Sequence, residues 1–197
     1  GNLVATRLPL LQTQHHALPY PHDAGVRSMP RMCSSATVRA PWGPVRVMTT
    51  HLEFYSPRQR MAEAQALVGL HAQACLQATH PPLADETGAP FQAKAHTASS
   101  ILCGDFNLET GNAEYPLLQA APAEAGITRL QDAWPLVHGA HTPHAPTFRL
   151  HDHRYGPVPI SCDFVFVSDD IASRVQRIEV NTVTRASDHQ PVVVVLD

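Results

Sequence analysis

The chain has 197 residues, of which 44% are hydrophobic, and this length and composition suit one soluble domain with a substantial core. Its 14 Lys and Arg residues against 17 Asp and Glu give a formal net charge of −3, and Lys94 is the only lysine. This balance excludes a broad basic surface, so any contact with nucleic acid must be local. The apolar runs are too short to span a bilayer, and the first residues lack the basic and apolar regions of a signal peptide.

The first predicted elements are two antiparallel strands within residues 34–53, which read SSATVRAPWGPVRVMTTHLE. Both halves of this segment alternate and are rich in Val and Thr, which is typical of strands. The PWGP segment between them favours a tight turn. The second strand then runs into His51.

A helix is predicted from about Pro57 to Thr79. Ser56 is a good N-cap residue, Pro57 suits the first helical position, and Gln59 follows three residues after the Ser. The apolar residues that then recur at helical spacing are Met61, Ala64, Val68 and Cys75. One face of this helix should therefore pack on a sheet.

Residues 79–99 are rich in Pro, Gly and polar residues and show no periodicity, so we expect an exposed loop insertion within a single domain. Later strands are predicted to start at Ile101 and to cover Asp163–Ser168, Val175–Val183 and Pro191–Leu196. The last of these, PVVVVL, is apolar enough to lie in a sheet that is covered on both faces.

The four cysteines show no C-x-x-C spacing of the kind found in metal and redox motifs. We interpret Cys33, Cys75, Cys103 and Cys162 as mainly buried free thiols. Free thiols favour a reducing, cytoplasmic compartment and leave a periplasmic one open.

Three histidines, His138, His141 and His144, fall three residues apart in a segment that contains prolines. Imidazole is a common zinc ligand, so a zinc site is conceivable there. The trio includes no cysteine or carboxylate, however, and solvated loop histidines are the favoured interpretation.

Polar side chains cluster at the ends of the predicted strands. These residues are His51 after RVMTT, Asp105 and Asn107 in GDFN, Asp163 before FVFVS, and Asp188 and His189 before QPVVVVL. Carboxylates, imidazoles and an amide suit a hard divalent cation and a phosphate better than a serine or thiol nucleophile. Each motif alone also has a simpler interpretation: GDFN as a capped turn, SDHQP as a loop, and TTHLE as a strand end with a surface histidine.

In their order along the chain, several of these motifs resemble the endonuclease/exonuclease/phosphatase family of DNase I-like enzymes. The matching segments are TTHLE, Arg60 in the helix that follows, ILCGDFN, DAWPLVHGAHTPHAPTF, CDFVFVS and SDHQPVVVVL. The resemblance extends from Gly1 to Asp197, because GNLVATRLPLL is similar to an early strand of the family with a turn at Thr6, Arg7 and Pro9.

The resemblance implies an α/β fold, a four-layer α/β/β/α sandwich of two mainly antiparallel sheets, and hydrolysis of a phosphoester. In the family's pattern, Asp105 would orient and deprotonate the attacking water, and Asn107 would donate hydrogen bonds to the phosphoryl oxygens. Asp163 would hold His189 so that it stabilises the phosphate, and His51 would contact the phosphate or the leaving group. These roles agree with the chemistry of positioned carboxylates, amides and imidazoles.

The resemblance also implies a metal cofactor, magnesium, with manganese as the alternative. Asp188, Asp105 and Asn107 are the metal ligands that the family's pattern assigns to this sequence.

One departure from the family concerns the start of the chain. The family carries an Asn and a metal-binding Glu in strands before the segment that resembles GNLVATRLPLL, and Asn2 and Glu53 lie at the wrong places to replace them. The resemblance therefore implies that residues 1–197 are the C-terminal portion of a domain whose N-terminal strands are missing. We expect weak metal binding, little hydrolysis by the chain alone, and an exposed sheet edge that allows self-association.

The predicted function is that of a metal-dependent phosphodiesterase, nuclease or phosphatase in which water attacks phosphorus. The substrate is left open between nucleic acid, lipid and a small phosphodiester, although the low basicity disfavours a processive DNA nuclease. The alternative is a non-catalytic binding module that retains the sandwich. Folding alone would not require so many polar groups at strand ends, which argues against the binding module.

Overall fold

The computed structural model describes residues 1–83 and 94–197, and these residues form eight strands and four helices. The strands are β1 Leu10–Ala17, β2 Met32–Ala40, β3 Gly43–His51, β4 Ser100–Asp105, β5 Leu130–Asp132, β6 Asp163–Ser168, β7 Val175–Val180 and β8 Val192–Leu196. The helices are α1 Pro57–Thr79, α2 Glu114–Leu118, α3 Ala133–His138 and α4 Asp169–Ala172. Within the described ranges, no helix has both the length and the apolar character needed to cross a bilayer.

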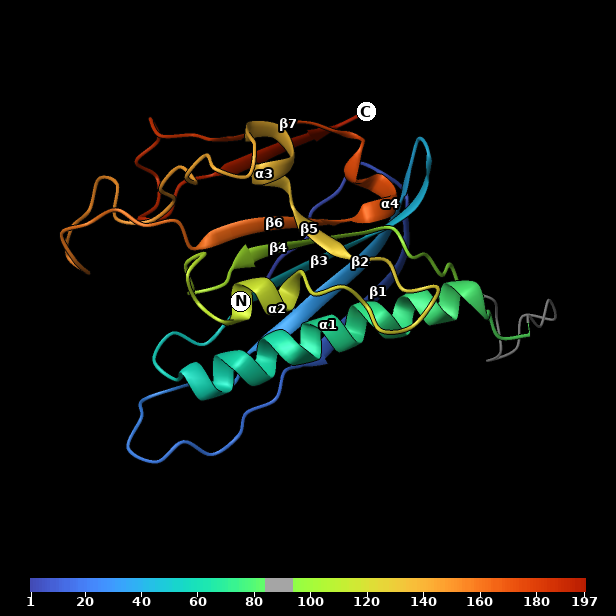
Figure 1. Cartoon of the computed structure of the whole chain (residues 1–197), viewed down its shortest axis with the longest axis horizontal. Helices are drawn as coiled ribbons and strands as arrows, with labels where there is room; N and C mark the ends of the chain where they lie inside the picture. The colour runs from blue at the N-terminus through green and yellow to red at the C-terminus, as the bar shows by residue number, and fades with distance from the viewer. Residues whose placement is uncertain (84–93) are drawn as a thin grey trace.

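Six strands form a large, mainly antiparallel sheet in the order β1-β2-β3-β4-β6-β5, and β7 pairs with β8 in a second sheet (Figure 1). This is the mixed α/β architecture with two sheets that the sequence predicts. Strands β3 and β4 are parallel, whereas β6 is antiparallel to β4. The C-terminal ends of β3 and β4 therefore meet the N-terminal end of β6 at one end of the sheet.

Helix α1 covers one face of the large sheet and has the predicted bounds (Figure 1). The hydroxyl of Ser56 accepts a hydrogen bond from the backbone N–H of Gln59 at 3.1 Å, as expected of an N-cap. Ala64 and Leu67 of the helix are fully buried in a core cluster that also contains Phe166 of β6. Burying a side chain as large as Leu67 contributes roughly 1.5–3 kcal/mol, which is how this face fixes the helix on the sheet.

The other face of the large sheet packs against the second sheet and α3. Side chains alternate along β6, so Val165 lies in a different cluster from its neighbour Phe166. That second cluster contains Trp134 of α3 and Ile178 of β7. The large sheet is therefore held from both faces, which gives the residues at its end a rigid support.

The prediction that the last strand is covered on both faces is wrong. Val193 and Val195 of β8 are 42% and 36% exposed, whereas Val192 and Val194 pack beside Ile178. An apolar run indicates a strand, but its composition does not show whether a second layer covers its outer face.

Two other predicted boundaries differ from the structure. Strand β7 stops at Val180, because the side chain of Asn181 accepts hydrogen bonds from the backbone N–H groups of Val183 and Thr184 and turns the chain. Strand β1 begins only at Leu10, so Leu10 and Leu11 are the residues of the GNLVATRLPLL segment that lie in a strand. The short strand β5 was not predicted at all.

Part of the predicted loop at 79–99 lies outside the described residues, because 84–93 are not described. The flanking residues 80–83 and 94–99 contain no helix or strand, and α1 ends at Thr79.

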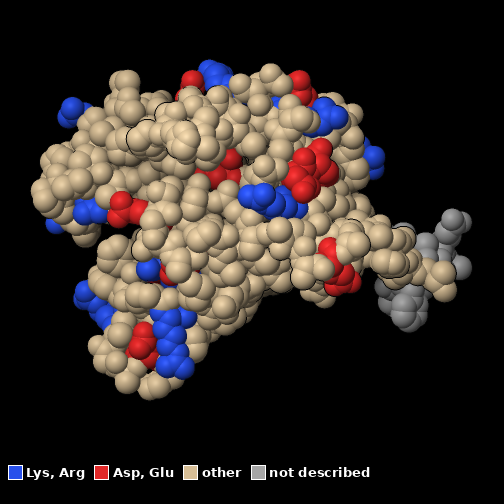
Figure 2. All heavy atoms as spheres, in the orientation of Figure 1, with Lys and Arg blue, Asp and Glu red and all other residues tan. Residues whose placement is uncertain are grey.

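The structure agrees with the sequence-based interpretation of the cysteines as mainly buried free thiols and with the expected lack of a broad basic surface. All four cysteines are free, and three of them are buried, while Cys103 is partly buried. Lys and Arg side chains are scattered among acidic ones over the face seen in Figure 2, without a continuous basic area on that face.

Candidate active site

Three of the predicted site residues lie in one row across neighbouring strands. His51, the last residue of β3, is paired in register with Asp105, the last residue of β4. Asp105 is paired in turn with Asp163, the first residue of β6. Because paired residues of adjacent strands project to the same face, the register brings these three side chains together at one end of the sheet.

The turn after β4 orients Asp105. Gly104 has φ 147°, and a Cβ atom there would lie 2.0 Å from the carbonyl oxygen of Thr50, so only glycine fits this close approach. Oδ1 of Asp105 accepts the backbone N–H of Asn107 at 2.9 Å, and Nδ2 of Asn107 donates to the carbonyl of Leu52 at 2.8 Å. The capped-turn interpretation of GDFN is thus correct for one carboxylate oxygen, and the other is left for the site.

The second oxygen of Asp105 faces two histidines. Oδ2 lies 3.4 Å from Nε2 of His51 and 3.7 Å from Nε2 of His189. The side chain of Asp105 is 14% exposed, while that of His51 is 49% exposed. A water or substrate oxygen beside Oδ2 would therefore be within reach of a carboxylate and two imidazoles at once.

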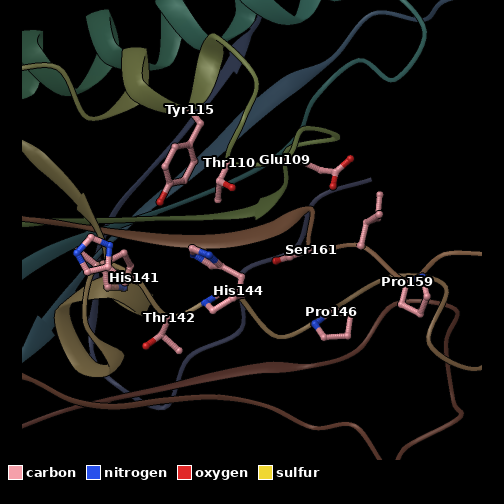
Figure 3. Close-up of a pocket in the computed structure, with 13 residues that line it drawn as sticks. Glu109, Thr110, Tyr115, His141, Thr142, His144, Pro146, Pro159 and Ser161 are labelled. Carbon is pink, nitrogen blue, oxygen red and sulfur yellow. The ribbon is translucent and has the colours of Figure 1, made fainter.

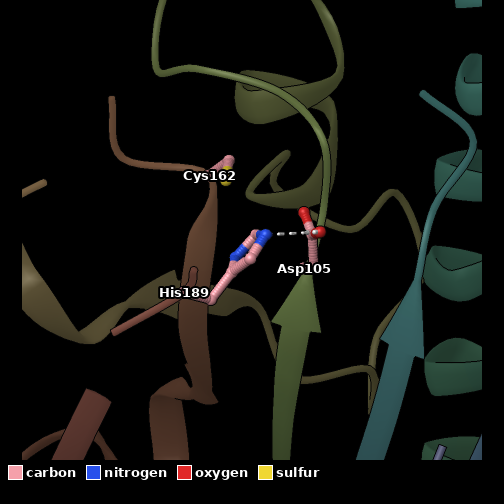
Figure 4. Close-up of side chains that lie close together, drawn as sticks. All are labelled: Asp105, Cys162 and His189. Atoms are coloured by element: carbon pink, nitrogen blue, oxygen red, sulfur yellow. Dashed lines mark ion pairs between the residues drawn. The ribbon is translucent and has the colours of Figure 1, made fainter. Parts of the chain in front are cut away.

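His189 reaches this position from the loop before β8 and is held from two sides. Its Nδ1 lies 2.9 Å from Oδ2 of Asp163, which makes Nδ1–H the donor. Its Nε2 faces Asp105 (Figure 4). The hydroxyl of Thr147 donates to the same Asp163 oxygen at 2.6 Å. The ring of Phe148 stacks on His189 with centroids 4.4 Å apart. The imidazole is therefore fixed in one orientation.

The surroundings of Asp105, His189 and His51 shift the pKa values of these three side chains. Burial, and after it the negative charge of Asp163, raises the pKa of Asp105 above its ordinary value. The hydrogen bond to Asp163 raises the pKa of His189, whereas partial burial lowers the pKa of His51. This arrangement favours the protonated form of His189 and increases the basicity of the Asp105 carboxylate.

The side chains of the site differ in how well they could bind a metal ion. Among the described residues, one group could hold a metal ion: Asp105, Cys162 and His189, whose ligand atoms lie within 4.8 Å of one another (Figure 4). Burial and the charge of Asp163 raise the pKa of Cys162, so its thiol is neutral and a poor ligand. The oxygens of Asp105 and Asn107 suit Mg²⁺, which prefers oxygen ligands.

Asp188, the third predicted metal ligand, does not belong to this group. Its side chain is exposed, and its Oδ1 accepts a hydrogen bond from the hydroxyl of Ser187 at 3.3 Å. Its position on the loop beside His189 places it near the cluster without a direct contact to Asp105.

The residues that sequence reasoning missed are Thr147, Phe148 and Cys162. Thr147 and Phe148 belong to the HAPTF segment, and Cys162 precedes Asp163, so the motifs contained them but gave them no role. A threonine followed by an aromatic residue is not a recognisable motif, so the sequence did not indicate that Thr147 contacts Asp163 and that Phe148 stacks on His189.

The histidine trio forms no metal site with the described residues. His138 and His141 are exposed, as expected of loop histidines. His144 is different, because its Nε2 lies 2.6 Å from the buried carboxylate of Asp132. His138 ends helix α3, and its Nε2 lies 2.9 Å from the carbonyl oxygen of Ile178. The interpretation as solvated loop histidines is therefore wrong for His144 and His138.

Comparison with known structures shows the same fold in several proteins. A structure of an endonuclease/exonuclease/phosphatase from Bacteroides vulgatus is 17% identical, with a TM-score of 0.63, and the match covers 95% of this chain and 65% of that one. A mannosyl-6-phosphatase from Bacteroides thetaiotaomicron is 20% identical, with a TM-score of 0.61 and coverage of 96% and 67%. D. rerio TDP2 complexed with a single-strand DNA product is 16% identical, with a TM-score of 0.60 and coverage of 97% and 69%.

At these identities the likeness concerns the fold, and the chain spans about two thirds of the length of these structures. No curated protein sequence matches the chain. The sequence model of the Endonuclease/Exonuclease/phosphatase family matches residues 1–189, nearly the whole chain. The protein therefore belongs to the endonuclease/exonuclease/phosphatase family, and the row of His51, Asp105 and Asp163 is its candidate active site.

Proposed function

We propose that the protein hydrolyses a phosphoester by attack of water on phosphorus. The observation that carries this proposal is the convergence of His51 and His189 on one carboxylate oxygen of Asp105, with His189 fixed by Asp163. Membership of a family named for nucleases and phosphatases supports the same chemistry.

In the proposed mechanism, Asp105 takes a proton from the attacking water as the new O–P bond forms and the bond to the leaving oxygen breaks. Protonated His189 stabilises the charge that builds up on the phosphoryl oxygens. Asn107 uses one N–H of its Nδ2 on Leu52, so its other N–H is left to donate to the same oxygens. His51, at the exposed side of the site, contacts the phosphate or the leaving group.

A magnesium ion fits the oxygen atoms of this site, with manganese as the alternative. Asp105 and the amide oxygen of Asn107 would hold it, Asp188 is the candidate for a further ligand, and waters and the substrate would complete its shell. When bound, the ion would neutralise part of the negative charge on the phosphate.

The second candidate function, a binding module without turnover, is less well supported. A carboxylate with a raised pKa beside a histidine with a raised pKa is costly to maintain and is typical of catalytic sites. A surface that only recognised phosphate would be better served by Lys or Arg side chains.

The substrate class follows partly from charge. The net charge of −3 and the single lysine give little long-range attraction for a nucleic-acid backbone. Solved structures with the same fold include both a sugar phosphatase and a protein with a DNA product, so fold alone does not choose between them. We favour a small phosphoester over a polynucleotide.

The test is hydrolysis of p-nitrophenyl phosphate and bis-p-nitrophenyl phosphate by a protein that carries these 197 residues, with Mg²⁺ and with a chelator. Asp105→Asn should lower kcat by roughly 10²- to 10⁴-fold, because the base is lost, with a smaller change in KM. Asp197→Asn, at the exposed C-terminal residue, is the control and should leave kcat unchanged. Retention of most of the kcat by Asp105→Asn would show that Asp105 is not the base.

A further inference from the structure

A large cavity adjoins the candidate active site. It has a volume of about 540 Å³, within the range of roughly 300–1,000 Å³ that small-molecule sites have. Glu109 and Ile160 line both this cavity and a smaller one of about 250 Å³ that reaches Asn107 and Cys162 of the active site. The large cavity is therefore placed to receive the part of a substrate that extends away from the reacting phosphate.

No Lys or Arg side chain lines the large cavity among the described residues. Hydroxyl groups line it at Thr110, Thr142 and Ser161, together with the Glu109 carboxylate and two histidines (Figure 3). The smaller cavity, in contrast, is lined by Arg60 and Arg149. The arginines thus lie on the side of the reacting phosphate, whereas the Glu109 carboxylate lines both cavities.

His144 is held rigidly in the wall of the large cavity. Its Nε2–H donates to Oδ2 of Asp132 at 2.6 Å, and the same oxygen accepts the hydroxyl of Tyr115 at 2.7 Å. Asp132 is itself fixed by the backbone N–H of Trp134 at 2.9 Å, and the Trp134 ring stacks on His144. With Nε2 committed to Asp132, Nδ1 is the nitrogen of His144 that remains to meet a ligand, and no described residue bonds it.

We infer that this cavity binds the leaving group of the substrate, and that the leaving group is uncharged and rich in hydroxyls, as in a sugar or polyol phosphate. The inference rests on the proposed hydrolysis of a phosphoester. Hydroxyl groups can donate to Nδ1 of His144 and to the Glu109 carboxylate, and can exchange hydrogen bonds with the wall hydroxyls. A second anionic group would instead be repelled by the Glu109 carboxylate, with no Lys or Arg in the described wall to pair with it.

The experiment compares glucose 6-phosphate with 6-phosphogluconate, two probes of similar size in which C1 is a hemiacetal carbon and a carboxylate, respectively. Sorbitol 6-phosphate, which has the open chain of 6-phosphogluconate without its carboxylate, is the control for ring opening and should behave like glucose 6-phosphate. We expect kcat/KM to be higher for glucose 6-phosphate by roughly tenfold or more, because of repulsion between the added carboxylate and Glu109. Glu109→Gln should bring this ratio close to one. Glu124→Gln, an exposed acid that lines a different cavity, should leave the ratio unchanged.

A second variant tests the histidine. His144→Gln should raise KM for glucose 6-phosphate several-fold with little change in kcat. The reason is that the imidazole of His144 positions the leaving group and takes no part in bond breaking. If the protein hydrolyses p-nitrophenyl phosphate but gives equal kcat/KM values for the two probes, the inference about the leaving group is overturned. A ratio of kcat/KM values that Glu109→Gln does not alter would overturn it as well. Absence of p-nitrophenyl phosphate hydrolysis by the unaltered protein would overturn the proposed function, and this inference with it.

Discussion

Asp163 raises the pKa of both His189 and Asp105, and its carboxylate is hydrogen-bonded to His189. Its hydrogen bond to His189 raises the pKa of that imidazole, and its negative charge adds to the effect of burial in raising the pKa of Asp105. Activity that needs Asp105 deprotonated and His189 protonated will rise with pH through the Asp105 pKa and fall through the His189 pKa.

Asp163→Asn should therefore move both limbs of the pH profile of kcat/KM to lower pH. The acid limb moves because Asp105 loses a negative neighbour, and the alkaline limb moves because His189 loses the partner that stabilises its charged form. The profile is measured with p-nitrophenyl phosphate, with the exposed Glu179→Gln as control. An alkaline limb that stays in place would show that His189 does not act as the acid.

The residues of this site were partly predictable. GDFN and SDH indicated Asp105 and His189, and the resemblance to the family indicated that Asp163 would pair with His189, which the 2.9 Å distance confirms. The capped turn expected of GDFN accounts for Oδ1 of Asp105. The sequence could not indicate that Oδ2 faces two histidines, because His51 and His189 come from other segments of the chain.

The end of β4 requires a glycine at position 104 because this strand lies very close to β3 there. Gly104→Ala places a Cβ 2.0 Å from the Thr50 carbonyl, whereas Gly43→Ala, at φ 133°, meets no atom within 4 Å. Backbone strain should cost roughly 1–3 kcal/mol in both variants. The clash adds to this cost in Gly104→Ala alone. Urea unfolding measures the difference, and equal losses in the two variants would contradict the close approach of β4 to β3.

Helix α1 carries a buried acid whose titration should be visible in stability. Oε2 of Glu63 accepts the backbone N–H of Glu53 at 2.8 Å, while Oε1 has no partner among the described residues. Burial, with the negative charge of Glu53 acting in the same direction, raises the pKa of Glu63 to about 7. The folded state thus holds this proton where the unfolded state has lost it.

The free energy of unfolding should therefore decrease by about 3 kcal/mol as pH rises from the unfolded pKa near 4.5 to beyond the folded pKa near 7. Glu63→Gln keeps an oxygen for the Glu53 N–H and removes the titration, so its stability should change less over this interval. Urea unfolding at pH 5 and pH 8 tests this. The same pH dependence in both proteins would show that Glu63 is ionised throughout.

The elements themselves differed in how well the sequence indicated them. Alternation in β2 and β3, capping at Ser56 and the DFVFVS run of β6 were local signals, and the structure confirms them. The two-sided burial expected for β8 was wrong, and the three-residue β5 was missed, because both depend on neighbours that the segment's own residues do not specify.

At the scale of the whole molecule, the site exists because distant segments meet. His51, Asp105 and Asp163 come from three strands that lie far apart in the sequence, and the register of those strands aligns them. His189 arrives from the loop before β8, where an isolated bridge pairs it with Phe148. No single segment of the sequence specifies that these four side chains meet, so their meeting at one site was expected mainly from the family resemblance.

A double-mutant cycle on Asp105 and His189 tests whether the residues of this site act together. These residues come from β4 and from the loop before β8, more than 80 positions apart. If they act as one unit, Asp105→Asn and His189→Gln should each lower kcat for p-nitrophenyl phosphate by roughly 10²- to 10⁴-fold, and the double variant should lose little more than either single one. Losses that multiply in the double variant, or single variants that keep most of their kcat, would contradict a shared role in phosphoester hydrolysis.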